Sequence, residues 1–488
     1  MNTEKNLVLD VEEVPSKIHQ WFLFSIQHVL AMLVACITVP ILTGLPIAAT
    51  IISAGLGTLC YLFVTKFKSP IFLSSSFTFI APILAALEVG LISDAGGQNY
   101  LAVILVMVIV AVVYLIIGIV IRFVGTSWLD KLLPPVVIGP IIMVIGLSLA
   151  KASVDNLTAA SALLNNMDLI AANPAIDAFD HYNLIAILCG FISLTVTALC
   201  AHYGKGTILS LIPYVLGMAS GYIVAIAFTL IGWNLCHNPY FNIVDFSAFS
   251  EIFGDNFSLA SIFNYKLFIP NDKESFLFLR FNEIKQFDWA RIFEIIVIFV
   301  PVTLVSICEH IGDHKNVGNV IGRDLLNDEP GLKNTITGGG LATGISGVLC
   351  GGATTTYGEN VAVVGTTRIA STRVIAFACI ITIFTGLFTP FTAFFKTLPS
   401  CVTGGVSLVL YGYISASGIN MIIREKVDFG KTRNIFIAAI IWISGIGGLS
   451  LTFGSFTLTP LAVAMILGIF FNIILREPKE LKENSKIE

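Results

Sequence analysis

The sequence predicts an all-α polytopic membrane protein with fourteen transmembrane segments arranged as two inverted repeats of seven. Three observations predict this fold: the composition, the number of long apolar runs and a set of internal matches. Hydrophobic residues make up 56% of the 488 residues, charged residues make up only 12%, and the mean hydropathy is +0.89. A soluble domain carries far more charge on its surface. We therefore expect most of the chain to lie in a lipid bilayer.

The apolar runs set the number of spans. A helix needs about 20 apolar residues to cross a bilayer. Runs of this kind lie near 20–43, 46–65, 100–122, 133–150, 183–202, 206–231, 292–318, 372–394, 401–422, 433–451 and 455–475. Further segments interrupted by Gly, Pro, Ser or Thr lie near 70–88, 331–349 and 350–366. Together these segments predict fourteen spans.

The basic residues set the orientation of the spans. Most Lys and Arg residues of the short connections fall on the same side as both termini, and such residues mark the cytoplasmic side. We therefore expect residues 1–19 to be a cytoplasmic N-terminus, residues 476–488 a cytoplasmic tail, and the protein to lie in the cytoplasmic membrane. Residues 232–289 form the longest polar segment, which we predict to be an outer insertion loop. Residues 1–17 lack the pattern of a removable signal peptide.

Internal matches divide the chain into two related halves. Segment 25–28 aligns with 306–310, segment 74–77 aligns with 354–357, and segment 133–139 aligns with 398–404. Because seven is an odd number of spans, the second half enters the membrane upside down relative to the first. Transporters of this design hold their substrate near the bilayer midplane, where matching broken segments meet. The broken segments 70–82 and 351–360 form such a pair.

Two glutamates at membrane depth are the first candidate site residues. Glu309 follows the apolar run 295–307, and Glu359 lies in a segment broken by glycines. An acidic residue at the centre of a spanning helix costs about 2.5–3.5 kcal/mol, so such a residue usually faces a cavity and has a function. We predict that both glutamates bind substrate and that Glu309 also exchanges a proton. The alternative for Glu309 is that it merely marks the inner end of its helix.

Further polar residues lie next to these glutamates. Asp313 follows Glu309 by four residues, so the two share a helix face. His310 adjoins Glu309 and matches His28 in the repeat. We predict proton coupling by Glu309, Asp313 and His310, although a solvated position at the helix end is an equal alternative for Asp313.

Aromatic and polar residues at equivalent repeat positions complete the predicted site. Phe77 and Tyr357 match each other and could flank a planar ring, while packing between helices is the alternative for both. Gln27 and His28 are polar residues of the first span. We predict that they support the site, and a hydrogen bond between packed helices is the alternative.

The sequence also excludes several classes of protein. We find no nucleophile and base pair, phosphate loop or metal-ligand spacing, so we expect neither an enzyme nor a cofactor or metal site. The absence of a basic run excludes nucleic acid as a partner. An anion transporter would favour a basic site, whereas the binding segments contain no Lys or Arg. A channel or a receptor remains an alternative that uptake measurements would distinguish.

Several motifs together resemble the nucleobase-ascorbate transporter family, most closely its bacterial uracil permease branch. The resemblance covers nearly the whole chain except the outer insertion. The motifs that carry it are Gln27-His28, Ser75-Ser76-Phe77, Glu309-His310-Ile311-Gly312, Gly322-Arg323-Asp324-Leu325, Thr355-Thr356-Tyr357-Gly358-Glu359-Asn360, and Gly404-Gly405-Val406-Ser407 with Leu410-Tyr411-Gly412.

The resemblance implies a division of the spans into two domains. Spans 1–4 (20–122) and 8–11 (292–394) would form a core domain, and spans 5–7 (133–231) and 12–14 (401–475) a gate domain. It also implies short strands in broken segments 3 and 10, and often a homodimer.

The resemblance further implies the function and its site. Glu309 and Glu359 would contact the base, and backbone groups around Phe77, Tyr357 and Gly358 would complete its hydrogen bonds. The family motifs add Ser76 to the substrate site and Asn360 and Tyr411 to its support. The implied activity is proton-coupled uracil import by alternating access, with H⁺ as the coupling ion.

One position leaves the substrate open within the family. Some uracil permeases carry His where this chain has Asp313, and an acidic residue there also occurs in purine transporters. The alternative implied by this departure is a xanthine or urate permease.

Overall fold

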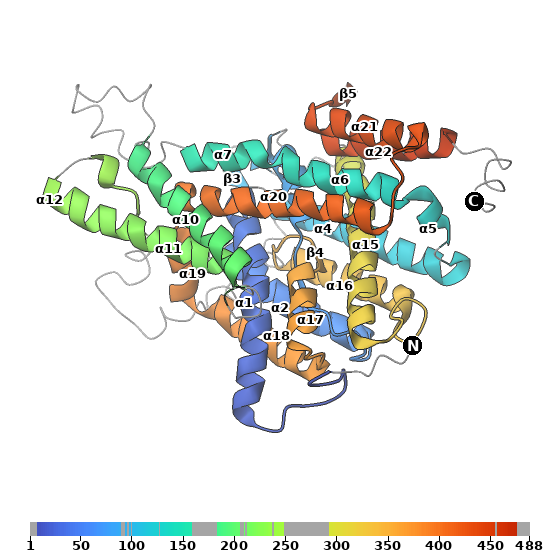
Figure 1. Ribbon diagram of the computed structural model, residues 1–488, viewed down its shortest axis with the longest axis horizontal. Coiled ribbons are helices and arrows are strands. Elements are labelled where there is room, and N and C mark those ends of the chain that lie inside the picture. The colour runs from blue at the N-terminus through green and yellow to red at the C-terminus, as the bar shows by residue number, and fades with distance from the viewer. Residues whose placement is uncertain are drawn as a thin grey trace.

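The computed structural model describes residues 7–88, 93–94, 97–98, 100–125, 127–158, 183–204, 209, 212–236, 239–247, 292–453 and 456–475. Most of the predicted outer insertion 232–289 and the predicted tail 476–488 lie outside these residues. The described part is mostly helical (Figure 1). Within it, seven helices are long and apolar enough to cross a membrane.

The elements follow one another in the order seen in Figure 1. The first half contains α1 (Ile18–Thr43), α2 (Ile47–Val64), β1 (Leu73–Ser75), η1 (Phe77–Phe79), α3 (Ile80–Glu88), β2 (Ser93–Asp94), β3 (Gly97–Gln98), α4 (Tyr100–Val124), α5 (Ser127–Leu132), α6 (Pro135–Ser148), α7 (Ala150–Thr158), α10 (Leu184–Tyr203), α11 (Pro213–Ala227), η3 (Phe228–Trp233), α12 (Asn234–Cys236) and η4 (Pro239–Phe241). The second half contains α15 (Ile292–Ile321), α16 (Gly331–Val348), β4 (Thr354–Thr356), α17 (Gly358–Thr367), α18 (Thr372–Leu387), α19 (Thr389–Lys396), α20 (Ser400–Arg424), α21 (Thr432–Ile446), β5 (Leu451–Phe453), β6 (Phe456–Leu458) and α22 (Pro460–Ile474).

Local sequence signals account for several helix boundaries. The Asn183 side chain accepts hydrogen bonds from the N–H groups of the first turn of α10, and Ser371 and Thr459 do the same for α18 and α22. These caps satisfy N–H groups that have no partner within the helix. At the other end of α1, Gly44 adopts a left-handed conformation with φ 70°, which glycine reaches without steric strain.

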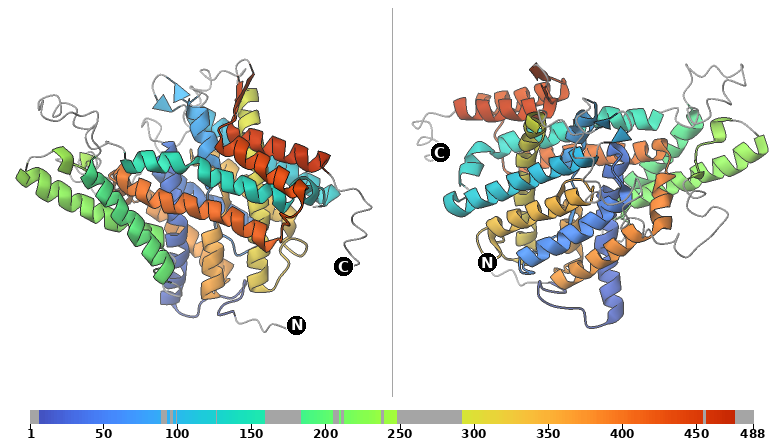
Figure 2. Two further views of the ribbon diagram at one scale, coloured as in Figure 1. Left: turned by 45° about the horizontal axis from the view of Figure 1, so that its top comes forward. Right: turned by 180° about the vertical axis from the view of Figure 1, so that it is seen from behind.

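One group of helices surrounds β1 and β4. Helix α16 packs between α4 and α2, and α2 packs in turn against α18. Figure 2, in the view from behind, shows these four helices as a row of neighbours. Helix α1 contacts α2 and α18, and α15 contacts α4 and α17. This group therefore combines residues 18–124 with residues 292–387.

A second group of helices packs along the first. Helix α20 contacts α6, α7 and α10, while α10 also packs on α11, and α21 packs on α6 and α22. In Figure 1 these helices lie above the first group and to its left. The two groups meet where α15 contacts α6 and α22 and where α1 contacts α11. The cavity described below lies between them.

Segment 331–349, in which glycines interrupt the apolar run, forms one continuous helix, α16 (Gly331–Val348). Its glycines serve close packing. A Cβ atom on Gly340 would lie 2.7 Å from Tyr114 Cβ, and one on Gly338 would lie 2.9 Å from Tyr61 Cδ2. Small residues allow helices to approach closely in membranes, where lipid provides no hydrophobic drive for helix association.

The N-terminal segment before α1 lies against the first group. Leu9 forms a parallel bridge with Ile369, and Asp10 pairs with Arg323 at 3.0 Å. The residues just after α15 and just after α17 are thereby connected to the start of the chain. The segment holds one end of the group together.

Candidate substrate site

Two short strands at the centre of the first group form the frame of the site. Strands β1 and β4 pair antiparallel, with Leu73 opposite Thr356 and Ser75 opposite Thr354. Each strand leads into a short helical segment: β1 into η1 and α3, and β4 into α17. All residues of both strands are buried. Non-helical backbone is tolerated at such a place only if its polar groups find partners in the protein.

Threonine hydroxyl groups satisfy the outer edges of this strand pair. Thr58 of α2 accepts from the Leu73 N–H and donates to the Leu73 carbonyl, both at 3.0 Å. Thr343 of α16 likewise donates to the Thr354 carbonyl at 3.0 Å and accepts from its N–H at 3.2 Å. On both edges, a threonine hydroxyl from a neighbouring helix thus satisfies one backbone N–H group and one backbone carbonyl of the strand.

The start of α17 faces a carboxylate of α15. The first N–H groups of a helix have no intrahelical partner, and this end carries a partial positive charge. A Cβ atom on Gly358 would lie 3.7 Å from Asp313 Oδ1. Glu359 stands in the first turn of α17. The helix start therefore offers backbone donors beside two carboxylates.

Helix α15 carries a polar stripe toward the same place. Glu309, Asp313 and Asn316 all line the cavity, as their spacing on one helix face predicts. The hydroxyl of Thr78 donates to Glu309 Oε2 at 3.2 Å, and the hydroxyl of Thr356 donates to Asp313 Oδ2 at 2.7 Å. Each of these carboxylates is therefore held by a residue of one broken segment.

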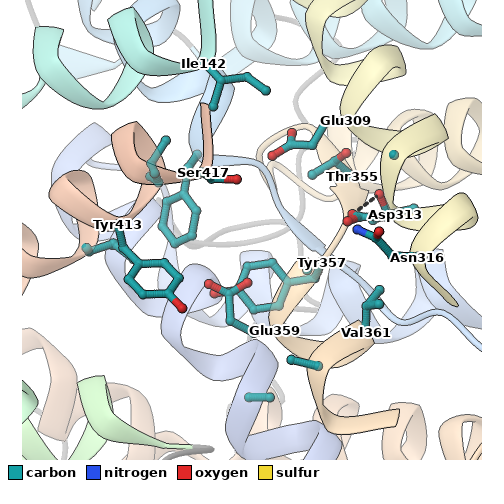
Figure 3. Close-up of a pocket in the computed structure, with 18 of the residues that line it drawn as sticks. Ile142, Glu309, Asp313, Asn316, Thr355, Tyr357, Glu359, Val361, Tyr413 and Ser417 are labelled. Carbon is teal, nitrogen blue, oxygen red and sulfur yellow. Dashed lines mark hydrogen bonds between the residues drawn. The ribbon is translucent and has the colours of Figure 1, made fainter. Parts of the chain in front are cut away.

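The cavity has a volume of about 450 Å³, which lies within the range of small-molecule sites. Figure 3 shows Glu309 and Glu359 on the wall of this one cavity, with Tyr413 and Ser417 on its other side. Its polar and aromatic lining residues are Ser75, Phe77, Tyr214, Glu309, Asp313, Asn316, Thr355, Thr356, Tyr357, Glu359, Tyr413 and Ser417.

The two predicted aromatic residues both line the cavity. The ring centroids of Phe77 and Tyr357 are 6.1 Å apart, and the rings are tilted by 44°. Tilted rings at this distance do not form a parallel sandwich around a planar ligand. They can instead contact one face or one edge of such a ligand, so flanking is the arrangement that fits this geometry.

The remaining predicted residues lie around the cavity rather than on its wall. Ser76, His310 and Tyr411 are buried and are not among the lining residues. His28 of α1 and Asn360 of α17 form a buried hydrogen bond of 2.8 Å between Nδ1 and Oδ1. Gln27 is half-buried beside His28. His28 thus connects α1 to the helix that carries Glu359.

Several lining residues were not predicted from the sequence. Tyr214 comes from α11, and Tyr413 and Ser417 come from α20. Thr78 was also missed, although its hydroxyl bonds Glu309. Tyr413 and Ser417 lie four positions apart on one face of α20, but Tyr411 and Ser415 form the same spacing on another face, so spacing alone does not identify the face that lines the cavity.

The described residues contain no group of three or more His, Cys, Asp or Glu side chains that could hold a metal ion. The polar groups of the site are instead carboxylates, hydroxyls, a carboxamide and backbone amides. These groups bind neutral polar molecules through hydrogen bonds.

Comparison with solved structures identifies the fold. The transmembrane domain of the cyanobacterial bicarbonate transporter BicA matches with a TM-score of 0.58 at 13% identity, and the match covers 95% of this chain and 99% of that one. At this identity the likeness concerns the fold alone. The fold is that of a helical membrane-transporter domain.

Sequence comparison defines the family. A family model named Xan_ur_permease, described as "Permease family", matches residues 19–453. The uracil permease of Bacillus caldolyticus is 36% identical over 479 residues, which are 98% of this chain and 96% of that protein. The uracil permease of Bacillus subtilis (strain 168) is 33% identical over 484 residues, 98% of this chain and 97% of that protein. The chain belongs to this permease family and is a multi-pass membrane protein, a transporter rather than an enzyme.

Proposed function

We propose that this protein is a proton-coupled uracil symporter that imports the free base across the cytoplasmic membrane by alternating access. The observation that carries the proposal is the cavity in which Glu309 and Glu359 stand together with Phe77, Tyr357 and the start of α17. The names of the full-length relatives given above support uracil as the substrate.

The cavity suits the hydrogen-bonding pattern of uracil. The ring presents N–H donors and carbonyl acceptors in one plane. Carboxylates of Glu309 and Glu359 accept from the ring N–H groups, and backbone N–H groups at Gly358 donate to a carbonyl. Phe77 and Tyr357 contact the ring. Asn360, Tyr411, Gln27 and His28 support these groups from behind.

Glu309 is our proposed proton-linked ligand. It shares the cavity wall with Asp313, and the hydroxyls of Thr78 and Thr356 bond the two carboxylates. A proton on one of them removes part of the repulsion between them. His310 adjoins this pair on the buried side of α15. H⁺ is then the coupling ion, and no other cofactor takes part.

The division into a core and a gate domain accounts for the movement that transport requires. We propose fourteen spans in two inverted repeats, with the first helix group as the core domain and the second as the gate domain. Substrate binds between them, and the core moves against the gate to open the cavity inward. In this plan both termini are cytoplasmic and the protein forms a homodimer.

Radiolabelled uracil uptake tests the proposal. Cells without their own permease would express the chain, with and without a protonophore and with excess unlabelled xanthine. We expect accumulation that the protonophore abolishes and that xanthine does not reduce. Competition by xanthine would favour the xanthine or urate alternative, to which the acidic residue Asp313 in the cavity points.

A substitution at Glu309 tests the proton assignment. Glu309→Gln keeps the size of the side chain but cannot exchange a proton. We expect it to abolish proton-dependent accumulation of uracil. If uptake and its proton dependence persist at similar protein amounts in the membrane, Glu309 is not the coupling residue.

A further inference from the structure

Helix α15 carries a second polar pair that does not reach the cavity. His310 and His314 follow Glu309 and Asp313 by one residue each, so they lie on the neighbouring, buried face of the helix. Their exposed fractions are 1% and 0%. The two rings stack with centroids 4.2 Å apart and an interplanar angle of 28°. Neither ring is among the groups that line the cavity.

The hydrogen bonds of His314 define its tautomer. Nδ1 lies 2.7 Å from the carbonyl oxygen of His310, and a carbonyl can only accept, so Nδ1 carries the proton. In the neutral ring Nε2 is then an acceptor. The Tyr61 hydroxyl lies 2.7 Å from this atom and therefore donates to it. The Ser69 hydroxyl lies 2.7 Å from the Tyr61 oxygen and, at the longer distance of 3.4 Å, also from His314 Nε2, so Tyr61 is the nearer partner of His314.

These hydrogen bonds connect α15 to α2 on the side away from the cavity. Tyr61 is fully buried in α2, and its ring lies against Gly338 of α16, where a Cβ atom would come within 2.9 Å of Cδ2. The ring therefore has little room to move. Its hydroxyl group occupies a fixed position beside His314.

Two consecutive residues of α15 are thus held in different directions. Asp313 accepts from Thr356 of β4 on the cavity side, and His314 accepts from Tyr61 on the buried side. Side chains of consecutive helical residues point about 100° apart around the axis. Two bonds at such an angle oppose both rotation and sliding of the helix. Glu309 stands one turn earlier on the same helix.

We propose that Tyr61 and His314 are positioning residues for the substrate site. Their buried hydrogen bond sets the rotation of α15, so that the carboxylates of Glu309 and Asp313 face the cavity. The inference rests on the proposed function only in the choice of ligand. It assigns to Tyr61 and His314 an effect on substrate affinity without any contact with substrate.

Tyr61→Phe is the direct test, because it removes one hydroxyl and keeps the ring. Tyr222→Phe is the matched control, since Tyr222 of α11 is also buried and its hydroxyl bonds Thr397, away from the cavity. Tyr61→Phe removes the hydroxyl that bonds His314 and Ser69, and Tyr222→Phe removes the hydroxyl that bonds Thr397. We expect Tyr61→Phe to raise the KM for uracil about tenfold, with a maximal rate within about twofold of the unaltered protein. Tyr222→Phe should leave KM unchanged.

A conservative variant separates positioning from folding. Gln at position 314 retains an acceptor for the Tyr61 hydroxyl, whereas Leu does not. We expect His314→Gln to keep KM within about threefold and His314→Leu to reproduce the defect of Tyr61→Phe. If Tyr61→Phe and Tyr222→Phe shift KM equally, or if Tyr61→Phe leaves KM unchanged, the proposal is wrong.

The unaltered protein distinguishes this failure from failure of the proposed function. If it transports xanthine instead of uracil, the same KM ratios are measured with xanthine. If it transports neither, the labelling of Glu309 and Asp313 by a carbodiimide is followed by mass spectrometry. We expect Tyr61→Phe to change that labelling at least twofold relative to Tyr222→Phe, and equal labelling in the two variants would overturn the proposal.

Discussion

The two broken segments of this chain use the same backbone arrangement but carry different chemistry. In the first, β1 leads through Phe77 into the apolar start of α3; in the second, β4 leads through Tyr357 into Gly358 and Glu359. Threonines of α2 and α16 close both strand edges in the same way. From Leu73 to Phe79 there is no charged residue. Both segments therefore share the strand arrangement, but only the second broken segment carries a charged residue.

This difference separates two tasks of the site. The strand pair and its threonines hold irregular backbone inside the protein, which both segments need equally. Ligand recognition needs carboxylates, and all those on the cavity wall, Glu309, Asp313 and Glu359, come from the second half. The first half contributes the uncharged residues Ser75, Phe77 and Tyr214 to the wall and Thr78 behind it.

The largest expected effect follows from this asymmetry of charge. Glu359→Gln in the second broken segment should reduce uracil uptake more than 100-fold, because the ring N–H loses a charged acceptor in a closed site. Ser76→Ala in the first segment should reduce uptake less than twofold, since Ser76 lies off the cavity wall. Initial uptake rates of the two variants, measured at matched amounts of protein in the membrane, test this difference. Similar losses from both variants would contradict the proposed division of tasks.

The next prediction concerns what the two segments share. Thr58→Val and Thr343→Val each leave one buried backbone N–H and one carbonyl without a partner. An unsatisfied buried polar group costs about 1–3 kcal/mol, so each variant should lower the apparent melting temperature of the purified protein by several degrees. The two losses should be equal within error. A loss from Thr343→Val alone would mean that only the second segment depends on its edge.

Sequence reasoning found the broken segments and the charges but not the opposite wall. Glu309 and Glu359 stand out because a charge in an apolar run is rare, and Phe77 and Tyr357 were found through the repeat. Tyr413 and Ser417 approach the cavity from α20, and no local pattern states which face of that helix meets α15.

The glycine-rich segment 331–349 shows a second limit of sequence reasoning. Glycine lowers helix stability in water, yet between membrane helices it allows close contact. Whether a glycine interrupts a helix or allows close packing depends on the neighbouring helix, and α4 and α2 are far from α16 in the sequence.

The two tyrosines of α20 show the same limit. Tyr411 and Tyr413 are two positions apart and so point to nearly opposite sides of α20. Only Tyr413 reaches the cavity.

A smaller effect should come from the bond between β4 and α15. Thr356→Val removes the hydroxyl that donates to Asp313, while Thr356→Ser keeps it. Loss of a donor to a buried carboxylate should raise KM for uracil about tenfold, and the serine variant should remain within about twofold. The equivalent position in the first segment is Ser76. An equal rise in KM for Thr356→Val and Thr356→Ser would show that the methyl group, not the hydroxyl, matters at this position.

The smallest effect should arise where the polar stripe of the second half meets the second helix group. Arg424, the last residue of α20, donates to Asn316 Oδ1 at 2.6 Å, whereas the repeat alignment places the apolar Val34 opposite Asn316. The Val34 side chain has no oxygen or nitrogen and so cannot form the corresponding hydrogen bond. An exposed hydrogen bond of this kind contributes little to stability, but the helix groups must separate there if the core moves against the gate. Arg424→Ala should raise the maximal uptake rate about twofold at unchanged KM, and Arg424→Lys should show less of the increase. A changed KM at an unchanged maximal rate would instead make Arg424 a substrate-binding residue. The substrate site would then include a charged residue from the second helix group as well as the three carboxylates of the second half.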